Sequence, residues 1–290
     1  MVLKAYAKLN LFLQVLKPKR KDNYHNLVTL FERIDLFDSI TLKKRADKKI
    51  RIICSDSSVP SGEDNLCFRA ARLLQDTCGV NIGVDIVIKK RIPVGAGLGG
   101  GSSDAATILL GLNKLWGLNL SLSRLVSLSG KIGSDVPFFL YDTPFALGTS
   151  RGDKITPLGN MKKVRLWHLL VVPKRHVSTP LIYRKFDRFS GLTRPAYNVK
   201  ILTSALKKKP VVLRRGLLFN NLEAVTRKEF PQVDRLKAKL QNLIGFNSVL
   251  MSGSGPAVFG ILRSKKEAVL FNRKLGAQVK RARRFLVRTV

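Results

Sequence analysis

Five glycines fall within seven residues of this chain, at residues 95–101, between a strand pattern and a helix pattern. Apolar residues alternate over residues 84–88, which predicts a strand, and recur at helical spacing over residues 105–116. Ser102–Ser103–Asp104 is expected to open that helix. Glycine lets a backbone approach a ligand closely, and the first N–H groups of a helix lack partners inside it. The segment is therefore expected to cradle an anion, most suitably a di- or triphosphate.

Two common phosphate-binding motifs do not describe this loop. It is not G-x-x-x-x-G-K-[ST], because no lysine follows the glycines. It fits the dinucleotide pattern G-x-G-x-x-G poorly, because no acidic residue is suitably placed after it. A flexible turn closed by an ordinary Ser or Asp cap is the structural alternative. Five glycines between a strand and a clean helix favour phosphate binding over that alternative.

The rest of the chain mixes strand and helix patterns. Further strands are predicted over residues 5–16, 39–42, 50–54, 165–172, 247–251, 256–262 and 285–290. Further helices are predicted from a cap at Asp64 or Asn65, over residues 123–131 and 231–243, and from about Lys265. Residues 17–26 form a polar, basic stretch that predicts a loop. Charge and pattern change near residue 155, which predicts domains of residues 1–155 and 156–290.

The chain is strongly basic, with 53 Lys and Arg against 19 Asp and Glu and a formal net charge of +34. Residues 1–150 hold 21 basic and 13 acidic residues, whereas residues 151–290 hold 32 and 6. The basic residues stand in short clusters between apolar segments, which favours a solvated basic surface. A phosphate-rich ligand and nucleic-acid binding are the alternatives. We expect no specific nucleic-acid partner.

Composition excludes several other classes of protein. With 45% hydrophobic and 25% charged residues the chain is globular and not disordered. No apolar run approaches the roughly 18–20 residues of a membrane span, and Lys4 and Lys8 interrupt the apolar N-terminus, which argues against a secretory signal. Cys54, Cys67 and Cys78 show no C-x-x-C spacing, so neither a disulfide framework nor a zinc site follows. We expect a cytoplasmic protein without a membrane partner, either a monomer or a homodimer.

Three segments together resemble the signature motifs of the GHMP kinases, the galacto-, homoserine, mevalonate and phosphomevalonate kinases. They are AYAKLNLFLQV at 5–15, PVGAGLGGGSSDAA at 93–106 and MSGSGPAVFG at 251–260. NYH at 23–25, GSDVPFFL at 133–140, STPLIY at 178–183 and FNNLEAV at 219–225 are similar to one branch of that family. That branch phosphorylates a cytidine diphosphate-linked methylerythritol in non-mevalonate isoprenoid biosynthesis. Because the motifs are collinear over nearly the whole chain, they are far more specific together than singly.

The resemblance implies an α+β protein with the two-domain GHMP kinase fold. The N-terminal domain would be like the second domain of ribosomal protein S5, the C-terminal domain would be ferredoxin-like, and the active site would lie in the cleft between them. The implied reaction transfers the γ-phosphate of ATP, with Mg²⁺, to the 2-hydroxyl of the cytidine diphosphate-linked methylerythritol. A GHMP kinase acting on homoserine or mevalonate is the alternative within the family. An RNA-binding module of the S5 type is the alternative from another class.

Lys8 and Asp135 are the candidate catalytic pair. Lys8 lies in an otherwise apolar strand, where an inward-pointing lysine needs a specific reason. The resemblance implies that it lies beside Asp135, in the polar turn before Phe138. Asp135 would then accept the proton of the attacking hydroxyl while Lys8 keeps the carboxylate ionised. A lysine that extends along the strand to the surface, and an aspartate that only forms the turn, are the structural alternatives.

The resemblance also implies the ligand-binding residues. The residues implied for ATP are Pro93, Val94, Gly95, Ala96, Gly97, Leu98, Gly99, Gly100, Gly101, Ser102, Ser103 and Asn65. The residues implied for the second substrate are Asn10, Tyr24, His25, Phe31 and Tyr183. Tyr24 and Tyr183 would stack on cytosine, which contributes roughly 1–3 kcal/mol per base, and His25 would contact the edge of the base. Ser102, Ser103 and Asp104 remain open as Mg²⁺ ligands, and His168 and His176 receive no role.

The chain departs from the usual motifs of that branch at two positions. Asn23 replaces the usual glycine of D-G-Y-H, and Asn221 replaces the usual aspartate of N-D-L-E. Asparagine adopts the left-handed backbone conformation more readily than most residues, so the turn at Asn23 is expected to survive. The change at Asn221 removes one acid. Because Lys8, Asp135 and the glycine segments are intact, we expect an active enzyme.

Overall fold

A computed structural model describes residues 1–189, 195, 198–208, 211–276, 279 and 281–290 of the protein. Its strands are β1 (Val2–Lys19), β2 (His25–Arg45), β3 (Ile50–Cys54), β4 (Gly83–Lys89), β5 (Phe145–Thr149), β6 (Lys154–Pro157), β7 (Trp167–Pro173), β8 (Phe219–Asn220), β9 (Val249–Met251), β10 (Val258–Leu262) and β11 (Ala282–Arg288). Its α-helices are α1 (Leu66–Cys78), α2 (Gly100–Leu115), α3 (Leu122–Ser129), α4 (Val136–Leu140), α5 (Thr179–Arg188), α6 (Val199–Lys207), α7 (Leu222–Glu229), α8 (Pro231–Ile244) and α9 (Lys265–Gly276). Among these described residues, no helix is both long and apolar enough to cross a membrane.

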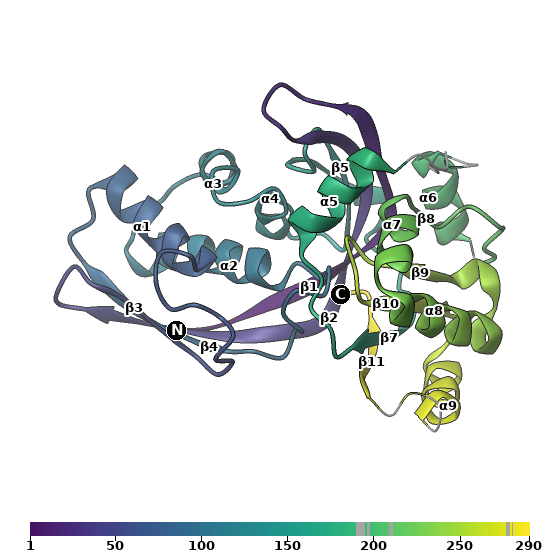
Figure 1. The fold of residues 1–290 in the computed structure, drawn as a ribbon. Coiled ribbons are helices and arrows are strands. Elements are labelled where there is room, and N and C mark those ends of the chain that lie inside the picture. The colour runs from purple at the N-terminus through teal and green to yellow at the C-terminus, as the bar shows by residue number, and fades with distance from the viewer. Residues whose placement is uncertain (190–194, 196–197, 209–210, 277–278, 280) are drawn as a thin grey trace.

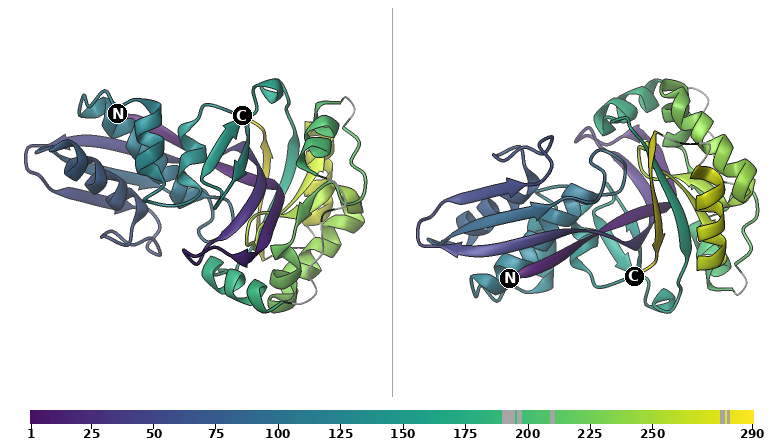
Figure 2. Two further views of the ribbon diagram at one scale, coloured as in Figure 1. Left: turned by 90° about the horizontal axis from the view of Figure 1, so that it is seen from above. Right: turned by 90° about the horizontal axis from the view of Figure 1, so that it is seen from below.

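One long hairpin, β1 and β2, runs through both lobes of the molecule (Figures 1 and 2). Its strands pair antiparallel from Val2 opposite Thr41 to Lys19 opposite His25, with bulges that bend them along the way. The sequence predicted β1 but only residues 39–42 of β2. The loop that it predicted over residues 17–26 is longer than the turn in the structure. The turn of the hairpin occupies only residues 20–24. The other predicted strands and helices are present with shifted ends, whereas β5, β6, β8, α4, α5, α6 and α7 were not predicted.

The first sheet has the strand order β3-β4-β2-β1-β8, with β5 paired to β2 and β6 paired to β5. Helices α1 and α2 lie together on one face of it (Figure 1). Their apolar sides share a core with that face, in which Ile40, Ile86, Ala105 and Leu109 are fully buried. The order of strand, glycine loop and helix predicted from the sequence is confirmed, since β4 leads through residues 90–99 into α2. This core fixes the start of α2 relative to the sheet.

The second sheet is antiparallel, with the strand order β11-β7-β10-β9. A helical crossover links β7 to β9, β9 and β10 are adjacent, and α9 links β10 to β11. Helices α8 and α9 lie on the outer side of this sheet, away from the long hairpin (Figure 2). This order with these connections is the ferredoxin-like arrangement. The predicted α+β fold class is therefore confirmed.

The two sheets share a core and a buried polar contact. Phe12 and Leu30 of the hairpin belong to the same apolar cluster as Leu170 and Phe259 of the second sheet. Beside them, Glu32 Oε1 lies 2.9 Å from His168 Nε2 and accepts a 2.5 Å hydrogen bond from the Thr289 hydroxyl. His168 received no role from the sequence. Its contact with Glu32 joins β7 to β2, and the side chains of both residues are fully buried.

Residue 155, predicted as the domain boundary, lies inside β6, which pairs with β5 of the first sheet. The second sheet begins only with β7. The division into residues 1–155 and 156–290 stays a prediction.

Replacing Glu32 by leucine should lower the free energy of unfolding by about 3 kcal/mol, because it leaves His168 and Thr289 buried without their acceptor. Urea unfolding followed by circular dichroism measures this. Glu229→Leu is the matched control, since Glu229 makes a 3.2 Å ion pair with Lys185 and both side chains are partly exposed. The control should change stability by about 0–1 kcal/mol. Equal losses in the two variants would contradict a special role for the buried contact.

Candidate active site

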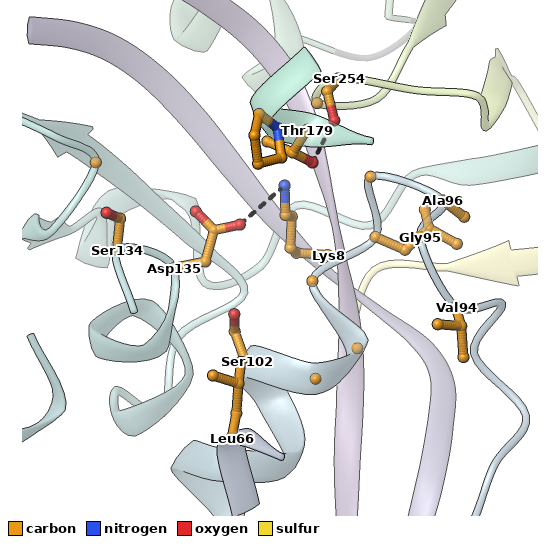
Figure 3. Close-up of a pocket in the computed structure, with 18 of the residues that line it drawn as sticks. Lys8, Leu66, Val94, Gly95, Ala96, Ser102, Ser134, Asp135, Thr179 and Ser254 are labelled. Carbon is orange, nitrogen blue, oxygen red and sulfur yellow. Dashed lines mark hydrogen bonds and ion pairs between the residues drawn. The ribbon is translucent and has the colours of Figure 1, made fainter. Parts of the chain in front are cut away.

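A cavity of about 930 Å³ lies where the two lobes meet. Figure 3 shows Lys8 near its centre, with Asp135 on one side and the loop of Gly95 and Ala96 on the other. All but one of the predicted site residues line this cavity: Lys8, Asn10, Tyr24, His25, Phe31, Asn65, Pro93, Val94, Gly95, Ala96, Gly97, Leu98, Gly99, Gly100, Gly101, Ser102, Asp135 and Tyr183. The exception is Ser103, which is buried inside α2 and donates its N–H to the Gly99 carbonyl. The structure therefore brings together residues that the sequence spreads over 176 positions, from Lys8 to Tyr183.

The glycine loop alternates between partly buried glycines and buried anchors. Gly95, Gly97 and Gly99 have φ values of 64°, 76° and 69°, in the left-handed region that favours glycine. Ala96 and Leu98 between them are almost fully buried and hold the loop to the core. Helix α2 begins already at Gly100, earlier than predicted, so its unpaired N–H groups face the cavity. A backbone of this form, leading into a helix N-terminus, is suited to bind phosphate.

A second glycine loop, between β9 and β10, packs directly against the first. A side chain on Gly97 would place its Cβ 2.2 Å from the Ser252 carbonyl oxygen, so only glycine fits there. The Ser252 hydroxyl donates a 3.0 Å hydrogen bond to the Gly97 carbonyl, and the Ala257 N–H donates to the Ala96 carbonyl at 3.3 Å. The two lobes are thus joined backbone to backbone at the cavity wall.

The FNNLE segment supports this second loop from behind. Asn220 Nδ2 donates to the carbonyls of Met251 and Gly253, at 2.9 and 2.7 Å. Glu223 accepts the Met251 N–H at 3.0 Å and pairs with Lys237 at 2.6 Å. All the polar groups in this support are buried and mutually satisfied, which favours one loop conformation.

Lys8 and Asp135 meet at the centre of the cavity, with 3.3 Å between Lys8 Nζ and Asp135 Oδ2. The lysine side chain is only 4% exposed, whereas that of Asp135 is 34% exposed and reachable from the cavity. Asp135 stands at the N-cap position of α4 but makes no capping hydrogen bond, so its carboxylate is directed at Lys8. The stem of Lys8 lies against Gly99, since a Cβ there would be 3.0 Å from Lys8 Cγ. The ammonium group is therefore beside the start of α2.

Asn10 and Phe31, both predicted to contact substrate, hold Lys8 in place. Asn10 Oδ1 accepts a 2.5 Å hydrogen bond from Lys8 Nζ, and Asn10 Nδ2 donates to the Thr29 hydroxyl at 2.8 Å. The Phe31 ring centroid lies 5.5 Å from Lys8 Nζ and stacks on Phe138 at 4.8 Å. Both ends of the Asn10 amide thus bond within the protein, and both residues orient the ammonium group.

The far end of the cavity is aromatic. Asn23 has φ 63°, which confirms the left-handed conformation predicted for it, and the turn presents Tyr24, which is 51% exposed. The guanidinium of Arg151 lies 4.9 Å from the Tyr24 ring centroid. Tyr183 on α5 also lines the cavity, and burial, followed by the charge of Asp135, raises the pKa of its phenol. The two tyrosines therefore place aromatic rings on the wall of the cavity at this end.

Asn65 caps helix α1, which was the structural alternative for it, and it also lines the cavity. Its Oδ1 accepts the Cys67 N–H at 2.7 Å and so caps α1, while Nδ2 donates to the Pro60 carbonyl at 2.6 Å. The residue also lines the cavity, together with its neighbour Leu66. The cap alternative considered from the sequence is therefore present in the fold.

A buried ionic cluster that the sequence did not reveal lies under the glycine loop. Lys90 Nζ contacts Asp38 Oδ2 at 2.5 Å and Asp104 Oδ2 at 2.8 Å. Asp38 Oδ1 also accepts the N–H groups of Arg91 and Ile92, where the loop begins. Burial lowers the pKa of Lys90, but the two carboxylates more than reverse this, so the net pKa is raised. Burial raises the pKa of Asp104 to about 7, although Lys90 opposes the increase.

Several other polar residues of the cavity were missed. They are Arg151, Arg184, Thr179 and Ser254, and the last two share a 2.8 Å hydrogen bond between their hydroxyls (Figure 3). The arginines are indistinguishable in sequence from the many surface cations, and no spacing signal identifies them. Thr179 and Ser254 belong to segments that the sequence did single out, but only the fold brings them into contact.

The departure at Asn221 has a structural explanation. Its Oδ1 accepts the Val15 N–H at 3.0 Å and its Nδ2 donates to the Val15 carbonyl at 2.8 Å. An amide satisfies both groups, whereas an aspartate would lack the donor. Asn221 therefore attaches the start of α7 to β1.

The arrangement combines three chemical capabilities. It has a backbone cradle for phosphates, a carboxylate paired with a lysine, and an aromatic slot with arginines beside it. Among the described residues, no three His, Cys, Asp or Glu side chains gather in a way that could hold a metal ion. Together these features suit transfer of a phosphoryl group between two bound molecules.

Comparison with known proteins agrees with this geometry. The family model of the GHMP kinases N terminal domain matches residues 65–143, and that of the GHMP kinases C terminal matches residues 202–281. A 4-diphosphocytidyl-2-C-methyl-D-erythritol kinase from Alkaliphilus metalliredigens is 41% identical over 90% of this chain and 88% of its own length. A crystal structure of 4-(cytidine 5'-diphospho)-2C-methyl-D-erythritol kinase is 33% identical, with a TM-score of 0.82 over all of both chains. A mevalonate kinase structure, 16% identical with a TM-score of 0.72, shares the fold.

Replacing Lys90 by methionine should lower the free energy of unfolding by about 3–5 kcal/mol, because it leaves two buried carboxyl groups without their cation. ATP should also bind more weakly, because Asp38 then loses its hold on the start of the glycine loop. Lys89→Met is the matched control, since Lys89 is the exposed residue directly before Lys90, at the end of β4. Its change should stay within about 0.5 kcal/mol. Chemical unfolding and ATP titration of the two variants measure both effects, and matching results would refute the cluster's role.

Proposed function

The chain belongs to the GHMP kinase family, and on that basis we propose that it phosphorylates 4-diphosphocytidyl-2-C-methyl-D-erythritol on its 2-hydroxyl group. The phosphate donor is ATP, and the reaction is a step of non-mevalonate isoprenoid biosynthesis. The single observation that carries this proposal is the position of the Lys8–Asp135 pair. It lies between a phosphate cradle and an aromatic slot, where a donor and an acceptor would meet.

The donor side is the glycine loop. The triphosphate binds the backbone N–H groups of residues 95–101 and the start of α2, whose dipole favours negative charge. Lys8 supplies the cation that the loop itself lacks. The nucleoside extends toward Pro60, Asn65 and Leu66, which line the cavity at the start of α1.

The acceptor side is the aromatic slot. Cytosine stacks between Tyr24 and Tyr183, and His25 contacts its edge, with the substrate diphosphate near Arg151 and Arg184. This slot favours a cytidine-linked alcohol over mevalonate or homoserine, which carry no ring to fill it. Phe31 and Asn10 form the inner wall and hold Lys8 toward the reacting hydroxyl.

The chemistry uses the central pair. Asp135 takes the proton from the 2-hydroxyl as its oxygen forms a bond to the γ-phosphorus, and the bond from that phosphorus to the bridging oxygen of ADP breaks. Lys8 holds the Asp135 carboxylate in position at 3.3 Å and offsets the negative charge that develops between the reactants. Most of the catalysis in such a transfer is positioning and charge neutralisation.

The residues at the start of α2 also fit a magnesium ion carried by ATP. Such an ion neutralises phosphate charge, and it typically takes only one or two protein ligands beside phosphates and waters. Of the three candidates, Ser103 is buried in the helix and Asp104 is bound to Lys90. Ser102 lines the cavity and lies below Asp135 in Figure 3, so we assign the ligand to its hydroxyl.

The expectations about cellular location, oligomeric state and macromolecular partners are also proposals. The enzyme acts in the cytoplasm, as a monomer or homodimer, without a membrane partner. Its net charge of +34 makes a solvated surface that attracts nucleic acids only loosely and without sequence preference.

Asp135→Asn should reduce turnover at least about 100-fold while leaving ATP affinity within a few fold, because asparagine keeps the size but cannot take the proton. A coupled assay for ADP, with the cytidine substrate, mevalonate and homoserine offered in parallel, tests both the role and the substrate. Asp142→Asn, at a surface ion pair with Arg33, is the control and should retain full activity. Near wild-type turnover of Asp135→Asn removes Asp135 from the mechanism, and turnover only with mevalonate or homoserine overturns the substrate.

Tyr183→Ala should raise KM for the cytidine substrate about tenfold or more, as loss of one stacking contact of about 1–3 kcal/mol implies. KM for ATP should scarcely change. Tyr6→Ala, at a half-buried tyrosine of β1 packed on Phe37, is the matched control and should leave both constants unaltered. If Tyr183→Ala raised both KM values equally, Tyr183 would be a packing residue of the lobe.

A further inference from the structure

We propose that Asp187 is a positioning residue that fixes the tautomer of His25 and thereby makes the aromatic slot select cytosine over uracil. The inference rests on the proposed function, which places a cytidine in this slot. Asp187 is outside the motifs that the sequence singled out, and it does not line the cavity. It acts only through the histidine.

The ring of His25 is held by α5 of the opposite lobe. Its Nε2 lies 2.7 Å from Asp187 Oδ1. The ring is tilted against Tyr183 at 5.6 Å between centroids and packs on Phe186 edge to face at 5.8 Å. With the side chain only 2% exposed, the imidazole has little freedom to turn. One carboxylate and two aromatic rings, all from one helix, therefore set its orientation.

The end of α5 that carries Asp187 is held in place from the hairpin. Lys17 Nζ donates hydrogen bonds to the Asp187 and Phe189 carbonyls, at 2.9 and 3.2 Å, where α5 ends. The same ammonium group lies 5.3 Å from the Phe186 ring centroid. Lys17 on β1 and His25 on β2 thus grip the last turn of α5 from two strands of one hairpin. The short distance between Asp187 and His25 therefore exists only when the two lobes are packed together.

A carboxylate accepts hydrogen bonds, so Asp187 requires a proton on Nε2 of His25. In the neutral ring the other nitrogen, Nδ1, is then an acceptor. Nδ1 makes no hydrogen bond with the described part of the chain, and it is not among the polar atoms sealed from solvent there. His25 lines the same cavity as Tyr24 and Tyr183, and its ring lies 5.6 Å from that of Tyr183. The slot therefore presents an acceptor at the edge of a stacked base.

Cytosine and uracil differ at this edge. Cytosine carries a 4-amino donor, whereas uracil carries a 4-oxo acceptor like that of thymine. The amino group can donate to Nδ1, but the oxo group meets another acceptor and leaves both unpaired. Sites that hydrogen-bond a polar substrate group discriminate strongly against analogues that lack it. Asp187 thus determines base specificity without touching the base.

The kinetic test compares the cytidine diphosphate-linked substrate with its uridine counterpart, in the wild type and in Asp187→Asn. The amide side chain can either accept from or donate to Nε2, so both tautomers become available. We expect the wild type to prefer the cytidine substrate at least about 100-fold in kcat/KM, and the variant to lose at least about tenfold of that preference. The loss should lie in KM for the pyrimidine substrates, with kcat for the cytidine substrate and KM for ATP nearly unchanged.

Asp234→Asn is the matched control, because it removes one carboxylate from an ion pair with Arg227 on the surface of the same lobe. It should leave the preference intact. An unchanged preference in Asp187→Asn, with an active wild type, refutes the role of Asp187 alone. A wild type that does not turn over the cytidine substrate refutes the proposed function instead. A fall in kcat with both substrates and a raised KM for ATP would mean that Asp187 only supports the fold.

The tautomer can be measured without any substitution at Asp187. The chain has three histidines, so the ¹⁵N imidazole spectrum is simple, and a His25→Gln variant assigns the signal. We expect the wild type to show a His25 that carries its proton on Nε2 and none on Nδ1. Protonation on Nδ1, or on both nitrogens, would overturn the proposal whatever the stability of the Asp187 variants.

Discussion

The backbone contact between the two glycine loops is the constraint on which the rest of this structure depends. Gly97 and Ser252 approach so closely that no side chain fits between them, and the hydroxyl of Ser252 bonds back to the Gly97 carbonyl. Because one loop follows β4 of the first sheet and the other joins β9 to β10 of the second, the contact sets how the lobes meet. The phosphate cradle, the central pair and the aromatic slot all lie along that junction.

Buried charge in this protein is concentrated where it holds the site in shape. Lys8 is held by Asn10 and Asp135, and Lys90 is held by Asp38 and Asp104 below the glycine loop. Buried ion pairs contribute little net stability relative to apolar packing, but losing one partner is costly. They therefore act chiefly to make alternative conformations of the loops unfavourable. The large excess of positive charge elsewhere remains at the surface, where its energetic effect is small and depends on salt.

The sequence predicted much of this because some of its signals are local. Alternation over β4, the glycine run and the apolar stripe of α2 depend on neighbours in sequence, and each appears as predicted. Asn23 adopts the left-handed turn for the same local reason. The second half of the hairpin was missed because β2 is buried along most of its length and its first part lacks clear alternation. Helices α5–α7 were missed because they span only 10, 9 and 8 residues, less than the roughly 11–18 residues over which a helical apolar pattern is recognised.

The sequence by itself determined the glycine loop, the fold class and about half of the residues that line the cavity, because glycine conformation, periodicity and collinear motifs are written along the chain. Only the tertiary structure decided which polar groups meet. His168 contacts Glu32 across 136 positions of sequence, and Asp187 contacts His25 across 162. Lys90 contacts Asp38, which lies 52 positions away, and joins it to Asp104. Hydrogen bonds and ion pairs require contact within about 3 Å. Such distances between remote residues exist only after the sheets have packed, so no pattern along the chain can reveal them.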